Sequence, residues 1–207
     1  MKAARPILLL LLLPALLPGC RQAPPGTTAP PFPYGEMREG DLAFRCGRGV
    51  FSRAVLSAEQ DPRYSHVGVL VKDDGVWKIV HAVPGETEFS GDFDRVKAEA
   101  PEGFFAADRA FRGCLVHTGL LDPDRTAALR EEALSLARDS VRFDGAYNLA
   151  DSSALYCTEL VWMLYRHRGI DLSEGRRRYL NVVGIHADCL LPEHLYGYTE
   201  NQVYYQY

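Results

Sequence analysis

Apolar and polar positions alternate most regularly in residues 64–83, YSHVGVLVKDDGVWKIVHAV. Two apolar runs rich in β-branched residues flank residues 73–75, and an Asp-Gly pair between such runs favours a tight turn. The pattern therefore predicts a β-hairpin. Shorter apolar runs bounded by glycines predict two further strands, at residues 40–47 and 113–119.

A helical period replaces this alternation in three other segments. Residues 48–60 place their apolar side chains on one face of a helix. Residues 121–140 contain Asp122 as the expected N-cap and Pro123 as the first helical residue. Residues 157–169, CTELVWMLYRHRG, predict a third helix that stops at Gly169.

The order of these elements predicts an α+β domain, in which an antiparallel sheet packs against helices on one of its sides. Residues 86–112 mix glycine, proline and charged residues, and we expect a long irregular excursion around a site there. The tyrosine-rich tail, residues 196–207, fits either an edge strand or the wall of a cleft.

The first twenty residues have the pattern of an export signal. Lys2 and Arg5 precede an apolar run at residues 7–17, which is shorter than the roughly 20 residues of a membrane span. The ending LLPGC resembles a bacterial lipobox, in which the cysteine becomes the lipidated first residue. We therefore expect a lipoprotein signal peptide at residues 1–19 and a lipid anchor on Cys20, with an ordinary cleaved signal as the alternative.

Composition divides the rest of the chain into a tether and a domain. Residues 20–35 are rich in proline, threonine and glycine, which predicts an extended tether. Residues 36–207 are numerous enough for one domain with a substantial core. The formal net charge is −4 without a basic block, so nucleic acid is not an expected partner.

The domain contains four cysteines without CxxC spacing, which argues against a zinc ribbon. They are Cys46, Cys114, Cys157 and Cys189. We expect at most one disulfide among them. Cys157 stands out because it lies at a predicted helix N-terminus, where free N–H groups lower a thiol pKa and can hold an oxyanion. The alternative is a small buried cysteine that only fills space.

A cysteine nucleophile needs a base, and the predicted hairpin offers two histidines. His66 lies near the start of the first strand and His81 near the end of the second, at nearly equal distances from the turn. The two rings should therefore be neighbours, although a slip of one residue in the register would put them on opposite faces. One ring can act as the general base and the other can orient it. The alternative for each is a purely structural histidine.

Several of these pieces together resemble a known family. The stretches GDLAF, YSHVGVL, KIVHAV and RFDGAYNLADSSALYCTELVWMLY are similar to the permuted papain-like amidases, the YiiX/YebB-like branch of the NlpC-type cysteine hydrolases. The resemblance covers residues 40–169 and implies a circularly permuted papain-like fold. It implies Cys157 as the nucleophile, His66 as the base and position 81 as the third polar member. Relatives often carry glutamate at that third position, where this chain has His81.

The expected function is therefore that of a cysteine hydrolase with no metal or organic cofactor. The resemblance implies amide substrates in peptides or in peptidoglycan stems. The lipobox implies a location in a bacterial cell envelope. The residue after the anchor is Arg21 and not the aspartate that retains lipoproteins at the inner membrane in some bacteria, which is a hint toward the outer membrane. Four further residues are candidates to line the cleft, although turn or structural roles would also explain them: Tyr64, Ser65, Asp144 and Tyr147.

Three alternative functions remain open from the sequence. An acyltransferase or lipase-like thioester enzyme, as in the lecithin:retinol acyltransferase relatives of this fold, would favour an apolar loop over the cleft, for which Phe104–Phe105 is the one hint. Cys157, His66 and His81 are also the ligand types of a zinc site. A non-catalytic, anchored binding module would keep the fold without needing the cysteine and the histidines.

Overall fold

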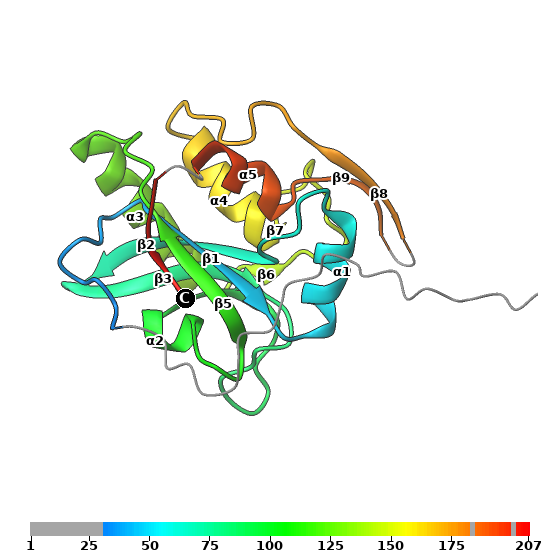
Figure 1. The fold of residues 1–207 in the computed structure, drawn as a ribbon, viewed down its shortest axis with the longest axis horizontal. Coiled ribbons are helices and arrows are strands. Elements are labelled where there is room, and N and C mark those ends of the chain that lie inside the picture. The colour runs from blue at the N-terminus through cyan, green and yellow to red at the C-terminus, as the bar shows by residue number, and fades with distance from the viewer. Residues whose placement is uncertain (1–30, 183–184, 200–201) are drawn as a thin grey trace, which may run out of the picture.

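The computed structural model describes residues 31–182, 185–199 and 202–207. The predicted signal peptide, Cys20 and the first part of the predicted tether lie outside these residues. The chain has a mixed α+β fold built on one eight-stranded sheet (Figure 1). In the described parts of the chain, no helix combines the length and apolar character that a membrane span requires.

The eight strands lie in the order β10-β5-β1-β2-β3-β4-β6-β7, and all neighbours are antiparallel except β6 and β7. The strands are β1 (Leu42–Gly47), β2 (His66–Asp73), β3 (Val76–Val83), β4 (Arg95–Glu99), β5 (Ala110–Val116), β6 (Arg142–Phe143), β7 (Ala154–Leu155) and β10 (Val203–Gln206). A separate antiparallel pair is formed by β8 (Arg178–Val182) and β9 (Ile185–Cys189). The predicted tail strand is thus an edge strand of the sheet.

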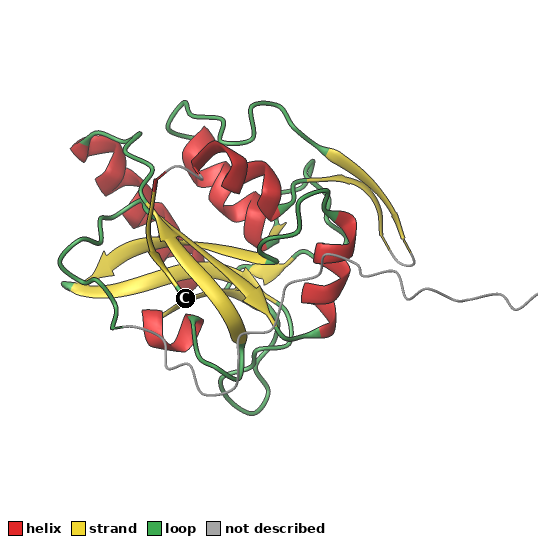
Figure 2. Ribbon diagram, in the orientation of Figure 1, coloured by secondary structure: helices red, strands yellow, loops and turns green. Residues whose placement is uncertain are grey.

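Helices cover both faces of the sheet, so the expectation of helices on one side only is wrong (Figure 2). The helices are α1 (Val50–Ala58), α2 (Pro101–Phe104), α3 (Pro123–Arg138), α4 (Cys157–Arg166) and α5 (Pro192–Thr199). The larger core joins one sheet face to α3, α4 and α5. The smaller core joins the other face to α2, because Phe104 and Phe105 insert their rings there.

The three predicted helices are confirmed, with one boundary explained by its cap. Helix α3 begins at Pro123 because the Asp122 carboxylate accepts a hydrogen bond from the Arg125 N–H at 2.9 Å. Gly169 has a φ of 79°, which is the left-handed conformation that ends a helix. Helix α1 is different from the others, because none of its residues is buried.

The described end of the predicted tether packs against the domain. The Phe32 ring lies 5.6 Å from the Phe105 ring and 5.3 Å from the Tyr205 ring, measured between centroids. Aromatic rings bury large apolar areas, and the second sheet face offers a partly open aromatic surface to them. The folded part of the chain therefore begins before residue 36, where the composition placed its start.

The hairpin β2–β3 has the register that brings the two histidines together. Asp74 and Gly75 form its two-residue turn, with φ angles of 47° and 80°, and Asp73 pairs with Val76. Leu70 pairs with Ile79, and because side chains alternate along a strand, His66 and His81 share a face with that pair. The predicted hairpin and the predicted proximity of the two rings are both confirmed.

Gly68 makes this arrangement possible. A Cβ on Gly68 would lie 2.5 Å from Ile79 Cγ2, 3.0 Å from the Val80 carbonyl oxygen and 3.1 Å from His81 Cβ. Gly68 therefore leaves the room that β3 needs to lie close beside β2 at this point.

We expect Gly68→Ala to destabilise the fold by about 1–3 kcal/mol, because the buried sheet face cannot relax fully around the added methyl group. Chemical denaturation measures this effect. Gly35→Ala is the control, because a Cβ there would meet no atom within 4 Å. Equal unfolding midpoints for the two variants would contradict the packing argument.

Two elements lie in residues 86–112, where an irregular excursion was expected, and both contribute residues around the histidine pair. The structure places β4 and α2 in this segment, and β4 pairs with β3 so that His81 lies opposite Lys97 and Ile79 opposite Glu99. Lys97 and Glu99 therefore lie on the face that carries His66 and His81. The prediction of an irregular excursion over residues 86–112 is therefore partly wrong, because β4, in the middle of this segment, continues the sheet.

Candidate active site

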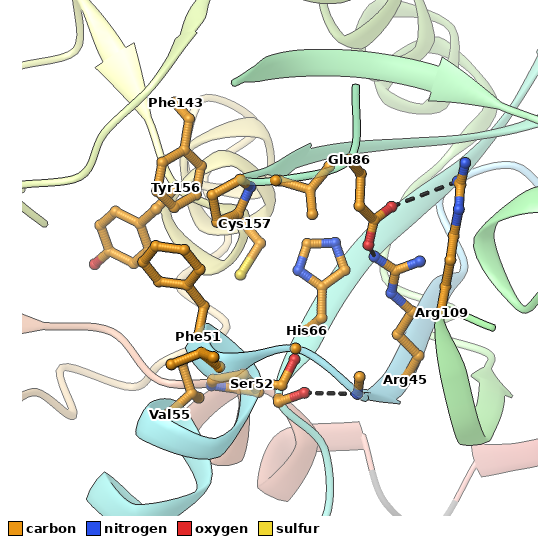
Figure 3. Close-up of a pocket in the computed structure, with 18 of the residues that line it drawn as sticks. Arg45, Phe51, Ser52, Val55, His66, Glu86, Arg109, Phe143, Tyr156 and Cys157 are labelled. Carbon is orange, nitrogen blue, oxygen red and sulfur yellow. Dashed lines mark hydrogen bonds and ion pairs between the residues drawn. The ribbon is translucent and has the colours of Figure 1, made fainter. Parts of the chain in front are cut away.

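A pocket of about 560 Å³ lies between helix α1, the start of α4 and the loop after β3 (Figure 3). Cys157 and His66 both line it. Figure 3 shows the Cys157 sulfur and the His66 ring facing each other in this pocket. The structure thus brings the predicted nucleophile and the predicted base to one cavity, from positions that are 91 residues apart in the sequence.

Cys157 is the first residue of α4, and the local contacts explain why the helix starts there. Tyr156 has an extended backbone, and its N–H donates to Glu159 Oε2 at 3.4 Å. The next turns are fixed by the buried side chains of Leu160, Val161 and Leu164. The half-buried sulfur lies 3.6 Å from the Thr158 hydroxyl oxygen.

Burial raises the pKa of the Cys157 thiol above its ordinary value, although several contacts act in the opposite direction. The Thr158 hydroxyl, the Val67 N–H and the Arg45 charge all favour the thiolate, but their effect is smaller than that of burial. The expectation that the helix N-terminus leaves Cys157 with a lowered pKa is therefore wrong. In the resting pocket the thiol is protonated at neutral pH.

His66 and His81 form a direct pair. His66 Nε2 lies 2.8 Å from His81 Nδ1, and the two rings are almost perpendicular, at 80°. His66 Nδ1 is therefore the nitrogen left for the thiol, and Figure 3 shows this side of the ring turned toward the sulfur. Both rings are buried, with exposed fractions of 6% for His66 and 0% for His81.

Glu99 lies on the far side of His81 and completes a row of four side chains, Cys157, His66, His81 and Glu99. Its Oε1 lies 2.7 Å from His81 Nε2, a close contact that does not meet the geometry of a hydrogen bond. A carboxylate only accepts, and a bare nitrogen at this distance would repel it, so the proton belongs on His81 Nε2. His81 Nδ1 then accepts the proton of His66 Nε2, and His66 Nδ1 is free to accept one from Cys157.

Burial favours the neutral form of both imidazoles. Burial lowers the pKa of both rings well below the ordinary value, and Arg45 adds to the effect. Phe104 of α2 encloses them, with its ring stacked at 5.6 Å from His66 and edge-on at 5.0 Å from His81. The resting state is therefore a neutral thiol facing a neutral base.

A group of charged residues that the sequence reasoning missed surrounds the histidines. Arg45 is paired with Glu86, and Glu86 lies 3.4 Å from Arg109 Nη1. Arg109 also lies 2.5 Å from Glu99 and so fixes that carboxylate from behind. The alternation in RVKAE, residues 95–99, was the one available signal for Lys97 and Glu99, but the strand is short and lies between irregular loops.

The structure separates the four predicted cleft residues into two pairs. Ser65 and Tyr147 line the pocket, and the Ser65 hydroxyl accepts a hydrogen bond from the Gly47 N–H at 2.9 Å. Tyr64 does not line it, because its ring is buried between Phe44 and Tyr196. Asp144 is also outside, and its carboxylate accepts hydrogen bonds from two backbone N–H groups of the following turn.

The Phe104–Phe105 pair does not cover the pocket. Both rings are buried on the α2 side of the sheet, where Phe104 packs on the histidines from behind. The sequence hint that favoured a lid of the acyltransferase type is therefore wrong.

No group of three or more His, Cys, Asp or Glu residues is arranged to hold a metal ion in the described parts of the chain. The zinc site considered from the sequence would need Cys157, His66 and His81 to point at one position. His66 and His81 instead use a nitrogen each to contact one another. The residues present do not fit that metal site. None of the four cysteines in the described residues forms a disulfide.

The fold is similar to that of a known structure. The chain matches the crystal structure of the metalloprotein YiiX from Escherichia coli O157:H7 with a TM-score of 0.61 and 17% sequence identity. The match covers 82% of this chain and 94% of that one, so the chain has a YiiX-like fold. No protein-family model matches the chain, and no curated protein matches it.

Proposed function

We propose that the protein is a cysteine hydrolase that cleaves amide bonds through an acyl-enzyme on Cys157. One observation carries the proposal. Cys157, at a helix N-terminus, and His66 face each other in one pocket, and His81 and Glu99 hold the His66 ring from behind. A nucleophile, a base and an oriented third group in this order are the arrangement that nucleophilic catalysis requires.

The first half-reaction forms a thioester. His66 Nδ1 takes the thiol proton as the sulfur attacks the carbonyl carbon, and the carbonyl oxygen becomes an oxyanion. The free N–H groups of the first turn of α4 are the donors available to that oxyanion. His66 then gives the proton to the leaving nitrogen, the C–N bond breaks, and the amine leaves. In the second half-reaction His66 activates water, which releases the carboxylic acid.

Nearby charged residues stabilise both of the charges that the proton transfer creates. When His66 becomes positive, Glu99 offsets this charge through His81, whose protonated nitrogen lies 2.7 Å from the carboxylate. When the sulfur becomes negative, Arg45 favours it, as its effect on the thiol pKa indicates. The ion pair of the Cys157 thiolate and the protonated His66 ring therefore forms during the attack and is not present beforehand. This account gives Glu99 the role that glutamate at the third position has in the resembling family.

The wider setting is part of the proposal. A circularly permuted papain-like architecture is consistent with the YiiX-like fold and with the order of His66 before Cys157. The LLPGC pattern supports a lipid anchor on Cys20 and a location in a bacterial cell envelope. Peptides and peptidoglycan stems are amide substrates found there.

Treatment with a thiol reagent and a chelator distinguishes this function from a metal-dependent one, which the word metalloprotein in the neighbour's name raises. We expect iodoacetamide to abolish amide hydrolysis and to modify Cys157 ahead of the buried Cys46, Cys114 and Cys189. Because burial raises the thiol pKa, the alkylation rate should keep rising above pH 9. A chelator should have no effect. Loss of activity with chelator and not with iodoacetamide would contradict the proposal.

A further inference from the structure

A second cavity, of about 460 Å³, lies between α5, the residues that lead into β8 and the loop before β2 (Figure 1). Among the described residues, Pro192 alone lines both this cavity and the reaction pocket, so the two are separate. The second cavity is lined by four arginines: Arg63, Arg176, Arg177 and Arg178. The proposed reaction uses none of them. We call this space the arginine cavity.

Two of the four arginines are paired with carboxylates that also line the cavity. Arg63 Nε lies 2.7 Å from Asp61 Oδ2, and Arg178 Nη2 lies 2.8 Å from Glu193 Oε1. Among the described residues, no further acidic side chain lines the cavity. Its walls therefore carry two positive charges, those of the other two arginines, for which they hold no carboxylate.

Arg177 is held in place by uncharged partners. Its Nη1 donates to the Ser173 hydroxyl and to the Arg176 carbonyl, both at 2.7 Å, and its guanidinium lies 4.8 Å from the centroid of the Trp162 ring. The Asp171 carboxylate interacts with Arg177 electrostatically, but Ser173 and Trp162 already donate to it. Arg177 Nε and Nη2 have no hydrogen-bond partner in the described part of the chain and remain available to a ligand.

Arg176 also has an available nitrogen. Its Nε donates to the Ser173 carbonyl at 2.9 Å, and its Nη2 lies 3.3 Å from the carboxylate of Glu174, an exposed pair that solvent screens. Nη1 lies against Gly197 of α5, where a Cβ would be only 3.0 Å from it. Gly197 thus lets the guanidinium lie close to the helix, and Nη1 has no hydrogen-bond partner within the described residues.

His194 supplies a third donor from α5, and it is only 6% exposed. Its Nδ1 accepts the Leu191 N–H at 3.1 Å, so the ring proton is on Nε2. Burial lowers the pKa of His194, and the charges of Arg178 and its two neighbours add to this effect although Glu193 opposes it. Glu193 Oε1 is 3.8 Å from Nε2, too far for a hydrogen bond, and the described residues offer Nε2 no other partner.

We propose that the arginine cavity binds a phosphate group through Arg176, Arg177 and His194. A phosphate group has three strong acceptor oxygens, which can meet donors from both α5 and the segment before β8. The planar fork of an arginine matches two of these oxygens at once. A carboxylate has two oxygens in one plane and would leave some of the donors unused. The cavity is many times larger than the roughly 30 Å³ of one water molecule, so it also has room for the group that carries the phosphate.

Isothermal titration calorimetry of the full chain with inorganic phosphate tests the proposal at low ionic strength. We expect one phosphate per chain with a Kd of about 1 mM or lower. Arg177→Gln and Arg176→Gln should each weaken binding about tenfold, because each variant removes a charge-assisted hydrogen bond. Arg125→Gln is the matched control, because it removes an exposed arginine of α3 that does not line the cavity. It should bind phosphate like the unchanged protein.

A further variant keeps the test valid if an arginine variant fails to fold. Gly197→Ala removes no contact, and its methyl group would displace Arg176 Nη1. We expect it to keep the thermal unfolding midpoint of the unchanged protein and to bind phosphate about threefold more weakly. Phosphate binding that is absent, or that is equally strong in all three variants, would overturn the proposal. Sulfate bound as tightly as phosphate, with no effect of the variants, would mean an adventitious ion only.

Vesicles distinguish the two sources of a phosphate group, a soluble molecule and a lipid headgroup. The full chain is sedimented with phosphatidylcholine vesicles that contain or lack phosphatidic acid. Additional retention on phosphatidic acid that Arg177→Gln abolishes would support the proposal with a lipid headgroup as the ligand. Calorimetric binding of phosphate without this additional retention would support it with a soluble ligand. Neither measurement depends on the chemistry of Cys157, so the proposed function and the phosphate site can fail separately.

Discussion

Cys157→Ala is expected to abolish amide hydrolysis, with a loss in kcat on the order of 10⁴-fold or more, because the thioester cannot form without the sulfur. The substitution removes one half-buried sulfur from the pocket wall and leaves the α4 cap, formed by Tyr156 and Glu159, in place. Its thermal unfolding midpoint should therefore stay near that of the unchanged protein. Steady-state kinetics and a melting curve measure the two effects.

Cys46→Ala is the matched control for this variant. Cys46 is a buried cysteine of β1 that forms no disulfide, so its loss affects packing and not the pocket. We expect this control to lose some stability and to keep its kcat. Residual kcat in Cys157→Ala at more than about one hundredth of the original value would show that the sulfur is not the nucleophile.

Glu99→Gln is expected to lower kcat on the order of 10²–10³-fold with little change in KM. The amide keeps the size of the carboxylate but removes its charge, and its NH₂ group can donate to His81 Nε2. His81 would then carry its proton on Nδ1, and His66 would carry its proton on the nitrogen that faces the thiol. The base would be in the wrong tautomer, and its positive charge would lack a counter-ion.

The effect on kcat separates an orienting role from a purely structural one. Glu99 does not line the pocket, so a merely local packing defect would not change the chemical step selectively. Glu102→Gln makes the same change on exposed residue 102 of α2, three positions away. It should leave kcat and KM unchanged. If Glu99→Gln keeps kcat within about threefold, His81 does not need the carboxylate and the proposed row ends at His81.

The parts of the site that follow from local pattern were predictable. The Asp74–Gly75 turn fixes the register of β2 and β3, and that register alone brings His66 and His81 to one face. Likewise, the start of α4 at Cys157 follows from the apolar spacing behind it. In both cases the information lies within about twenty residues of sequence.

The remaining parts depend on contacts between distant segments. Glu99 reaches His81 only because β4 pairs with β3, and the five residues of β4 are too few to show a period. Arg45 and Glu86 are 41 residues apart, and nothing in either neighbourhood indicates the pair. The raised pKa of Cys157 was also unpredictable, because a helix N-terminus is visible in the sequence while the extent of burial is not.

Trapping the acyl-enzyme tests the central claim most directly. The full chain is mixed with p-nitrophenyl hexanoate, quenched in acid within the first turnover, digested and analysed by mass spectrometry. The account predicts one hexanoyl group on Cys157, which disappears with time in water, and a strongly reduced yield in His66→Ala. An unmodified Cys157, or acylation of Cys157 that proceeds equally without His66, would contradict it.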